Sequence, residues 1–370
     1  MTRLARPGER RGTTTARLRL GVIGAGSWAV ASHLPELAKR RDQVEFVAVS
    51  RKGSAMLEKI KDDWGFAHAS EDYRDVLDAG VDICVVASPT GLHHEHAAAA
   101  LRSGAHVLVE KPMTIRPEHA WDLVRTADDL GRHLLLSFGW NYRPMLRAAK
   151  QLMDEQGVGE IEQMMLHMSS ATRELLLGTG AYPDASPETT PESRTWTDPA
   201  LSGGGYAQAQ LSHALGIALW LTGLRATEVF AFMSAPHGAG VELHDAVALR
   251  FDGGAVGTMA GGSAHVDAGG NKHQLELRVI GSEGQLHLDL EREALWLYRV
   301  PCSDIRPPLE PEAGLYDCVG PPNALVDLAL GEDVQNCSPG WLGARTVEIL
   351  DACYRSASSA TVATIEQGSG

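Results

Sequence analysis

The sequence predicts an α/β protein with two unlike halves: a doubly wound parallel sheet, then an α+β domain with an open, mostly antiparallel sheet. Up to Asn141, short apolar runs without alternation are separated by stretches with helical spacing, which is typical of a parallel sheet covered on both faces. After Arg143-Pro144, apolar and polar residues alternate with a period of two, and the turns "DGG" and "GSEG" join the runs. We therefore place one domain at residues 17–142 and a second at residues 143–370.

In the first half, the apolar runs are predicted to be strands because they are short, continuous and rich in Val, Ile and Leu. They cover residues 18–24, 44–50, 81–88, 106–109 and 133–138. The amphipathic stretches between them are predicted helices, at residues 27–40, 54–65, 94–104 and 117–131.

In the second half, a helix at residues 145–157 leads into the alternating segments. These segments predict strands at residues 161–170, 228–234, 245–262, 273–290 and 294–300. A Pro/Thr/Ser-rich loop, residues 178–202, and an apolar helix, residues 206–223, separate the first strand from the second. A closing helix is predicted at residues 341–358.

Composition excludes some classes of function. The chain has 370 residues, with 33 basic and 47 acidic side chains and a net charge of −14, which disfavours nucleic-acid binding but not a small anion in a local basic pocket. The five cysteines lie far apart without a CxxC pair, so we expect reduced thiols and neither disulfides nor a zinc site.

The ends of the chain and its apolar runs bear on location. Residues 1–16 are rich in Arg and Thr and lack an apolar core, so we interpret them as a disordered extension or a mis-called start, although Arg10-Arg11 resembles a twin-arginine signal. No stretch approaches the ~20 apolar residues of a membrane span, so we predict a soluble, cytoplasmic protein with no membrane partner.

The segment "GVIGAGSWA" has Gly24, Gly26 and Ala29 in a GxGxxG/A pattern, directly after a strand and at the start of a helix. Glycines at these positions permit a tight turn, and the helix N-terminus offers N–H groups to a diphosphate. We therefore predict a dinucleotide site that includes Ser27 and Trp28. The alternative is an ordinary glycine-rich turn.

The end of the second strand indicates which dinucleotide is bound. An NAD site is expected to have a carboxylate there for the ribose 2′-hydroxyl. This sequence has Ser50, Arg51 and Lys52 instead, which suit the 2′-phosphate of NADP. We predict NADP as the preferred cofactor, with NAD possible. The alternative is a solvated loop with two surface cations.

The segment "VLVEKPMT" places Glu110 and Lys111 where a buried strand ends. Ligands of doubly wound sheets bind at the carboxyl ends of the strands, so both residues are expected beside the nicotinamide. Lys111 would hydrogen-bond a substrate hydroxyl, and Pro112 would help to aim it by fixing the local backbone. The alternative is an exposed loop lysine.

Together, "GVIGAGSWA", "ASPTGLHHEHAAAALRSGAHVLVEKPMT" and "SGGGYAQAQLSHALGIALWLTG" resemble the Gfo/Idh/MocA family, that of glucose–fructose oxidoreductase and inositol dehydrogenase. The resemblance implies a Rossmann domain, an open-faced second sheet that often forms oligomer contacts, and NAD(P)-linked hydride transfer on sugars or cyclic polyols. It also implies that Lys111 is the active-site lysine. Pro89 and Thr90 would lie near the nicotinamide, where the family often has Asn at position 90. Ser88 and His93 are expected at the same mouth.

The family also has an aspartate followed four residues later by His or Tyr, after a glycine-rich turn. Counted from Gly203-Gly204-Gly205, the histidine is His213, but Ala209 stands at the aspartate position. On an α-helix Tyr206, Gln210 and His213 share one face, so we predict that they contact substrate together with Lys111. His213 is the candidate general acid/base. The alternative is a core histidine with a hydrogen-bond partner.

Other signals are weaker. The run His93–His96 has no further ligand pair at a suitable spacing, so we predict no metal. Arg194 and Trp196 are candidates to cover a sugar, and Asn271, Lys272 and His273 are candidates for ligand contact in a glycine-rich hairpin.

These observations predict an NADP-preferring oxidoreductase that moves a hydride between the nicotinamide and a secondary alcohol or ketone carbon of a sugar-like substrate. We expect a homodimer or homotetramer. Two alternatives stay open: a cofactor-binding sensor or scaffold that has lost catalysis, motivated by Ala209, and a glycosidase that uses its nicotinamide transiently.

Overall fold

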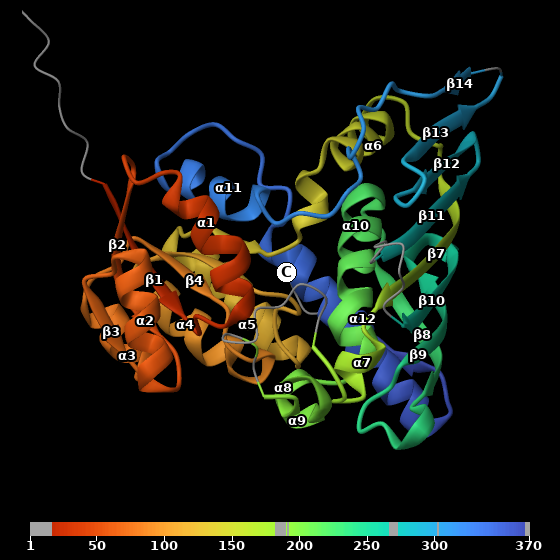
Figure 1. The fold of residues 1–370 in the computed structure, drawn as a ribbon. Coiled ribbons are helices and arrows are strands. Elements are labelled where there is room, and N and C mark those ends of the chain that lie inside the picture. Colours follow the sequence, from red (N-terminus) through yellow and green to blue (C-terminus); the bar gives the residue numbers. More distant parts are fainter. Residues whose placement is uncertain (1–16, 182–189, 191, 266–272, 302, 367–370) are drawn as a thin grey trace, which may run out of the picture.

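The computed structural model describes residues 17–181, 190, 192–265, 273–301 and 303–366 (Figure 1). The predictions made for residues 1–16, Asn271 and Lys272 lie outside these ranges. Among the described residues, none of the helices combines the length and the apolar character needed to cross a membrane.

The first half is a six-stranded parallel sheet in the order β3-β2-β1-β4-β5-β6. Its strands are β1 (Leu18–Ile23), β2 (Val44–Ser50), β3 (His68–Ser70), β4 (Ile83–Val86), β5 (His106–Val109) and β6 (Leu134–Leu136). Its helical segments are η1 (Ala29–His33), α1 (Leu34–Ala38), α2 (Ser54–Trp64), α3 (Tyr73–Asp78), η2 (Thr90–Leu92), α4 (His93–Arg102) and α5 (Pro117–Leu130). The predicted strands all form, and the elements of this half that were not predicted are the short β3, α3 and η2.

The strand order reverses between β1 and β4, and this switch point is where open α/β sheets bind ligands. The turn after β1 therefore lies beside the ends of β4 and β5. Gly24 has φ +81°, and a Cβ there would lie 2.4 Å from the backbone nitrogen of Ser88. Both the positive φ and this close approach require glycine.

The second half is a nine-stranded sheet in the order β14-β13-β12-β11-β7-β10-β9-β8-β15. Its strands are β7 (Ile161–Ala171), β8 (Ala226–Ser234), β9 (His244–Phe251), β10 (Val256–Ala264), β11 (His273–Gly281), β12 (Gly284–Asp289), β13 (Ala294–Arg299), β14 (Ser303–Ile305) and β15 (Ala363–Thr364). Among the pairings of the described strands, the central β7–β10 pair alone is parallel. The predicted fold class, a parallel sheet followed by a mostly antiparallel one, is confirmed.

Helices join the two sheets (Figure 1). The helical segments of this half are η3 (Gly139–Tyr142), α6 (Pro144–Glu155), α7 (Arg173–Leu176), α8 (Arg194–Thr197), α9 (Pro199–Ser202), η4 (Ala207–Leu211), α10 (Ser212–Thr222), η5 (Pro236–Gly238), η6 (Asp252–Gly254), α11 (Gly320–Ala329) and α12 (Gly340–Ser359). Helix α12 packs on β8 and on α5, and α10 packs on β7 and α12. Residues Ser212 to Leu221 of α10 are all buried, which is expected of a helix that is apolar on every side.

Two buried acidic residues, Glu242 and Asp245, lie close to the segment that leads into α10. The Glu242 carboxylate accepts hydrogen bonds from the backbone N–H groups of Gly205 and Ala207, at 2.8 and 3.0 Å, and from the Tyr354 hydroxyl at 2.7 Å. Asp245 is also buried, and within the described part of the chain neither of its carboxyl oxygens has a hydrogen-bond partner. Burial, helped by the charge of Glu242, raises the pKa of Asp245 to about 8. Asp245 is therefore protonated at neutral pH.

Asp245 makes folding stability depend on pH. Because its pKa is raised in the folded state, its contribution is complete below the unfolded pKa near 4 and is lost as pH rises through about 8. Asp245→Asn keeps the shape and stays neutral. The free energy of unfolding of this variant, relative to wild type, should rise between pH 5 and pH 8 by up to about 1.4 kcal/mol per pH unit. Urea unfolding at several pH values measures this difference, and a constant difference would contradict the assignment.

Candidate active site

A cavity of about 1520 Å³ lies between the two halves. The parallel sheet contributes the segments that follow β1, β2, β4 and β5, and the second half contributes η4, the start of α10 and the segment 312–319. The cavity is thus at the carboxyl edge of the sheet, where the switch point lies. The predicted positions Pro89 and Thr90 line it as well.

The glycine turn forms one end of the cavity. Gly24, Gly26, Ser27 and Trp28 all line it. The N–H groups of Gly24 and Ala25 each donate to the Ser50 carbonyl at 2.9 Å, which ties the turn to the end of β2. A Cβ on Gly26 would meet only the Gly24 carbonyl, at 3.9 Å, so this glycine opens the turn toward the cavity.

Cations gather next to this turn. Ser50, Arg51 and Lys52 line the cavity, and burial lowers the pKa of Arg51. Arg51 is half-buried and its Nη1 lies 3.4 Å from the Ala25 carbonyl, so it is not part of a fully solvated loop. Three further residues that line the cavity were not predicted: Glu71 and Asp72, which lie between β3 and α3, and Arg74, which lies in the first turn of α3. Since β3 has only three residues, no apolar run marked it.

Lys111 lies in the cavity, one residue after Glu110. Its Nζ donates to the carbonyl oxygen of Ala209, at 2.7 Å, across the boundary between the two halves. Burial lowers the pKa of Lys111, and the neighbouring Glu110 charge opposes that shift. The alternative of an exposed loop lysine is therefore wrong.

His213 also lines the cavity, together with Gln208 and Gln210, and all three are buried. In the described structure, His213 Nδ1 and the Oε1 atoms of both glutamines are buried and have no hydrogen-bond partner. Burial, and next the charges of Lys111 and His273, lower the pKa of His213 far below its usual value, so the imidazole is neutral at pH 7. Unpaired polar groups on a cavity wall are suited to binding a polar ligand.

Tyr206 requires a correction. It was expected to share a face with Gln210 and His213, but it does not line the cavity. The Tyr206 hydroxyl is buried against Ser170 Oγ, at 2.8 Å, and donates to the Met168 carbonyl at 3.1 Å. The physical reason is that residues 207–211 form a π-helical turn, in which Ser212 N donates to Ala207 O, so the 3.6-residue period does not hold. Gln208 lines the cavity instead.

The turn after β4 is braced by His93. Its Nδ1 is 2.9 Å from the Pro112 carbonyl oxygen and its Nε2 is 2.6 Å from the Ser88 carbonyl oxygen. His96 contacts Ser88 Oγ at 2.9 Å. Ser88, Pro89 and His93 all line the cavity, as expected, and each ring nitrogen of His93 lies within 2.9 Å of a main-chain carbonyl oxygen.

Aromatic side chains line another part of the cavity, and they were not predicted from the sequence. Trp140 follows β6, and Tyr316 lies on the segment between β14 and α11, with ring centroids 4.5 Å apart. The Tyr316 ring lies 5.4 Å from the His213 ring and 6.1 Å from the Trp28 ring. Trp196 and His273 also line the cavity, whereas Arg194 does not. These rings come from separate elements, so no spacing in the sequence reveals them.

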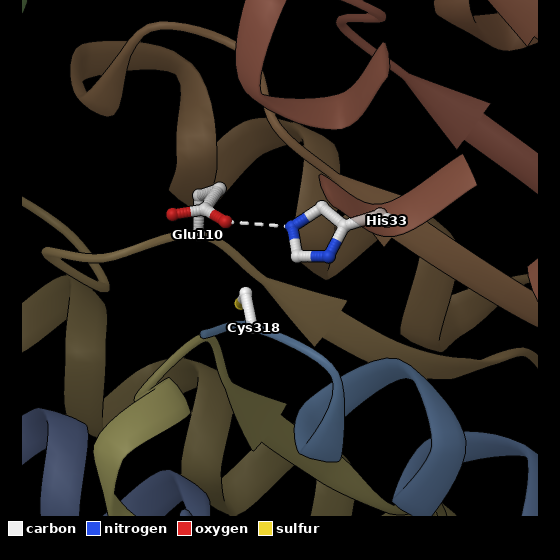
Figure 2. Close-up of side chains that lie close together, drawn as sticks. All are labelled: His33, Glu110 and Cys318. Carbon is white, nitrogen blue, oxygen red and sulfur yellow. Dashed lines mark hydrogen bonds and ion pairs between the residues drawn. The ribbon is translucent and has the colours of Figure 1, made fainter. Parts of the chain in front are cut away.

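Glu110 belongs to a cluster with His33 and Cys318 (Figure 2). His33 Nε2 is 2.7 Å from Glu110 Oε1, and Cys318 Sγ is 3.1 Å from Ser137 Oγ. Two ligand atoms of a tetrahedral zinc ion lie about 3.3 Å apart. The shorter His33–Glu110 distance is that of a hydrogen bond, and burial raises the pKa of the Cys318 thiol to about 12. The cluster is thus arranged as a hydrogen-bonded pair beside a neutral thiol.

Family models match both halves of the chain. Residues 18–138 match the Gfo/Idh/MocA oxidoreductase family with an NAD-binding Rossmann fold. Residues 146–287 match the Gfo/Idh/MocA C-terminal domain.

Curated relatives align over part of their length. The D-glucoside 3-dehydrogenase of Escherichia coli is 29% identical over 217 residues, 58% of this chain and 57% of that protein. The scyllo-inositol 2-dehydrogenase (NADP(+)) of Bacillus subtilis is 32% identical over 127 residues, 34% of each chain. A glycosyl hydrolase family 109 protein of Streptomyces coelicolor is 44% identical over 73 residues, 19% of this chain and 16% of that protein. The matches thus span little more than half of these relatives, or less.

Solved structures share the whole fold. Levoglucosan dehydrogenase in complex with NADH and levoglucosan superposes with a TM-score of 0.76 at 19% identity, covering 95% of this chain and 100% of the other. The WlbA dehydrogenase from Bordetella pertussis, in complex with NADH and UDP-GlcNAcA, gives 0.75 at 20% identity with the same coverage. The cavity at the sheet edge, the two family-model matches and this shared fold lead to one conclusion: the chain belongs to the Gfo/Idh/MocA family of oxidoreductases with an NAD-binding Rossmann fold.

Proposed function

We propose that the protein is an NADP-preferring oxidoreductase that transfers a hydride between the nicotinamide and a secondary alcohol or ketone carbon of a sugar, cyclic polyol or sugar derivative. The observation that carries the proposal is that Lys111 and His213 line one cavity together with the glycine turn. The names of the relatives, which act on a glucoside or an inositol, support the substrate class.

The residues present fit a dinucleotide. Gly24 and Gly26 leave room where side chains would intrude, and Ser50, Arg51 and Lys52 form the neighbouring wall. When bound, the nicotinamide supplies the acceptor or donor of the hydride. The protein's own part is to hold the substrate carbon, to polarise its oxygen and to move one proton.

Lys111 and His213 divide the proton chemistry. The Lys111 ammonium donates a hydrogen bond to the reacting oxygen and stabilises the charge that grows on it. The neutral His213 imidazole takes the hydroxyl proton in oxidation and returns it in reduction. Gln208 and Gln210 bind other hydroxyl groups through their Oε1 atoms, which lack a protein partner within the described chain. Trp140 and Tyr316 shield the site from water and stack on the apolar face of a sugar ring.

A glycosidase is the second candidate, because the glycosyl hydrolase family 109 relative shares 44% identity over its short matched region. Such an enzyme oxidises and re-reduces its substrate around an elimination step. It would release an aglycone from an aryl glycoside without a net change in nicotinamide absorbance, which distinguishes it from a dehydrogenase.

Turnover tests the proposed activity. We expect NADPH oxidation with at least one member of a panel of keto-sugars and keto-inositols. Lys111→Met should lower kcat by about 100-fold or more, since it removes the group that polarises the oxygen. The control is Lys150→Met, which removes a surface lysine paired with Asp154. Equal activity of Lys111→Met and wild type would contradict the mechanism.

Cofactor preference depends on the cations after β2. Arg51→Ser should raise the Kd of NADPH by about 10-fold or more, because a charge-assisted hydrogen bond to the 2′-phosphate is lost. The Kd of NADH should change less than about threefold, since NADH has no such phosphate. Fluorescence titration measures both constants, with the exposed Arg125→Ser as control. A parallel loss for the two cofactors would mean that Arg51 does not read the phosphate.

Ala209 places no charged side chain next to the Lys111 amine. A carboxylate within reach of the amine favours its charged form, so Ala209→Asp should raise the pKa of Lys111, which burial lowers in the wild type. The alkaline limb of kcat/KM, where Lys111 loses its proton, should move up by about one pH unit. Ala209→Asn is the uncharged control and should leave the limb in place. Identical limbs in the two variants would exclude this electrostatic role.

A further inference from the structure

A buried histidine that does not line the cavity contacts Glu110, the residue before Lys111. His33 ends the π-helical turn η1, is fully buried and lies 77 positions before Glu110. Figure 2 shows its ring directed at the Glu110 carboxylate, with Nε2 2.7 Å from Oε1. Within the described residues its other nitrogen, Nδ1, is buried and has no partner. The one hydrogen bond that the ring makes is therefore to Glu110.

Glu110 connects His33 to Lys111 through its two carboxylate oxygens. While Oε1 is engaged by His33, Oε2 accepts the backbone N–H of Lys111 at 3.1 Å. The Glu110 N–H donates to the Val86 carbonyl at the end of β4, at 2.8 Å. Burial alone would raise the pKa of Glu110, but the His33 hydrogen bond, with the charges of His33 and Lys111, outweighs it and the pKa is lowered. Glu110 is thus a buried carboxylate that needs its donors.

Two π-helical turns meet at this lysine. In η1, Leu34 N donates to Ala29 O, the bond to the fifth residue back that defines the turn, and His33 is its last residue. In η4, Ser212 N donates to Ala207 O in the same way, and Ala209 lies inside that turn. Such turns are rare and are frequently found at functional sites. The turn η1 is connected to the main chain of Lys111 through Glu110, and the turn η4 accepts a hydrogen bond from the Lys111 amine.

We propose that His33 is a positioning residue of the reaction: by holding the Glu110 carboxylate it fixes the backbone of Lys111, and so decides where the amine lies. The inference rests on the proposed function, in which Lys111 polarises the reacting oxygen. His33 does not line the cavity, so its effect on turnover passes through Glu110.

A second histidine–glutamate pair serves as a control. It distinguishes an effect of His33 on the position of Lys111 from a general loss of protein stability. His287 is also buried and contacts Glu276 through Nε2, at 2.8 Å, but it lies on β12, away from the cavity. His287→Leu therefore removes the hydrogen bond of another buried histidine, here to a partly exposed glutamate, at a place that does not line the cavity. His33→Gln keeps an N–H donor for Glu110, whereas His33→Leu does not.

The kinetic test compares these three variants with wild type, using NADPH and the best substrate of the panel. His33→Leu should lower kcat by about 100-fold with the KM for NADPH nearly unchanged, since misplacing a catalytic group by about 1 Å has this cost. His33→Gln should recover most of the loss, and His287→Leu should retain wild-type kcat. Equal kcat in His33→Leu and wild type, or equal losses in His33→Leu and His287→Leu, would overturn the proposal.

A structural readout keeps the inference separate from the proposed function. In a crystal structure of His33→Leu, the Lys111 amine should have left the Ala209 carbonyl, while in His287→Leu the two stay within hydrogen-bond distance. If the wild type turns over no sugar, the proposed function fails, but this comparison still decides the role of His33. An unmoved Lys111 amine in His33→Leu would contradict it.

Discussion

The hydrogen bond from Lys111 Nζ to the Ala209 carbonyl, at 2.7 Å, is the contact on which the account of this site depends. It joins the carboxyl end of β5 in the parallel sheet to the π-helical turn before α10 in the other half. Both supports are rigid: β5 is an inner strand of the parallel sheet, and α10 is buried along its length. Helix α12 packs on α10 and on α5, and so links the two halves behind this contact. Lys111 and His213 thus line one cavity between these two supports.

The electrostatics of this contact differ from what the family resemblance implies. Where a carboxylate was expected, a main-chain carbonyl holds the amine, and it does so without adding a charge. The acids of this region lie behind the helix instead: Glu242 fastens the Gly205 turn through backbone N–H groups, and Asp245 is neutral at pH 7. The cavity side of the helix consequently offers only neutral groups, from Gln208, Gln210 and His213. Glu110, on the strand side, is the carboxylate next to Lys111, and its position depends on His33.

The sequence predicted what is encoded locally. The fingerprint around Gly24, the strand end at Lys111 and the helix of His213 are short motifs, and the structure brings them to one cavity. What escaped prediction depends on the third dimension. Trp140 and Tyr316 are far apart in the chain, and His33 reaches Glu110 only once the helix after β1 packs beside β5. Tyr206 was misplaced because a π-helical turn shifts the register without a compositional signal. The parallel β7–β10 pair was equally hidden, because alternation does not reveal strand direction.

A crystal structure of the complex with NADPH and a sugar-like carbonyl substrate analogue tests most directly whether Lys111 and His213 act on the same substrate oxygen. We expect one oxygen of the analogue to lie within about 3.2 Å of both Lys111 Nζ and a ring nitrogen of His213, with its carbon facing the nicotinamide. An analogue bound with only one of these side chains at that oxygen, or a diphosphate lying away from the Gly24 turn, would contradict it.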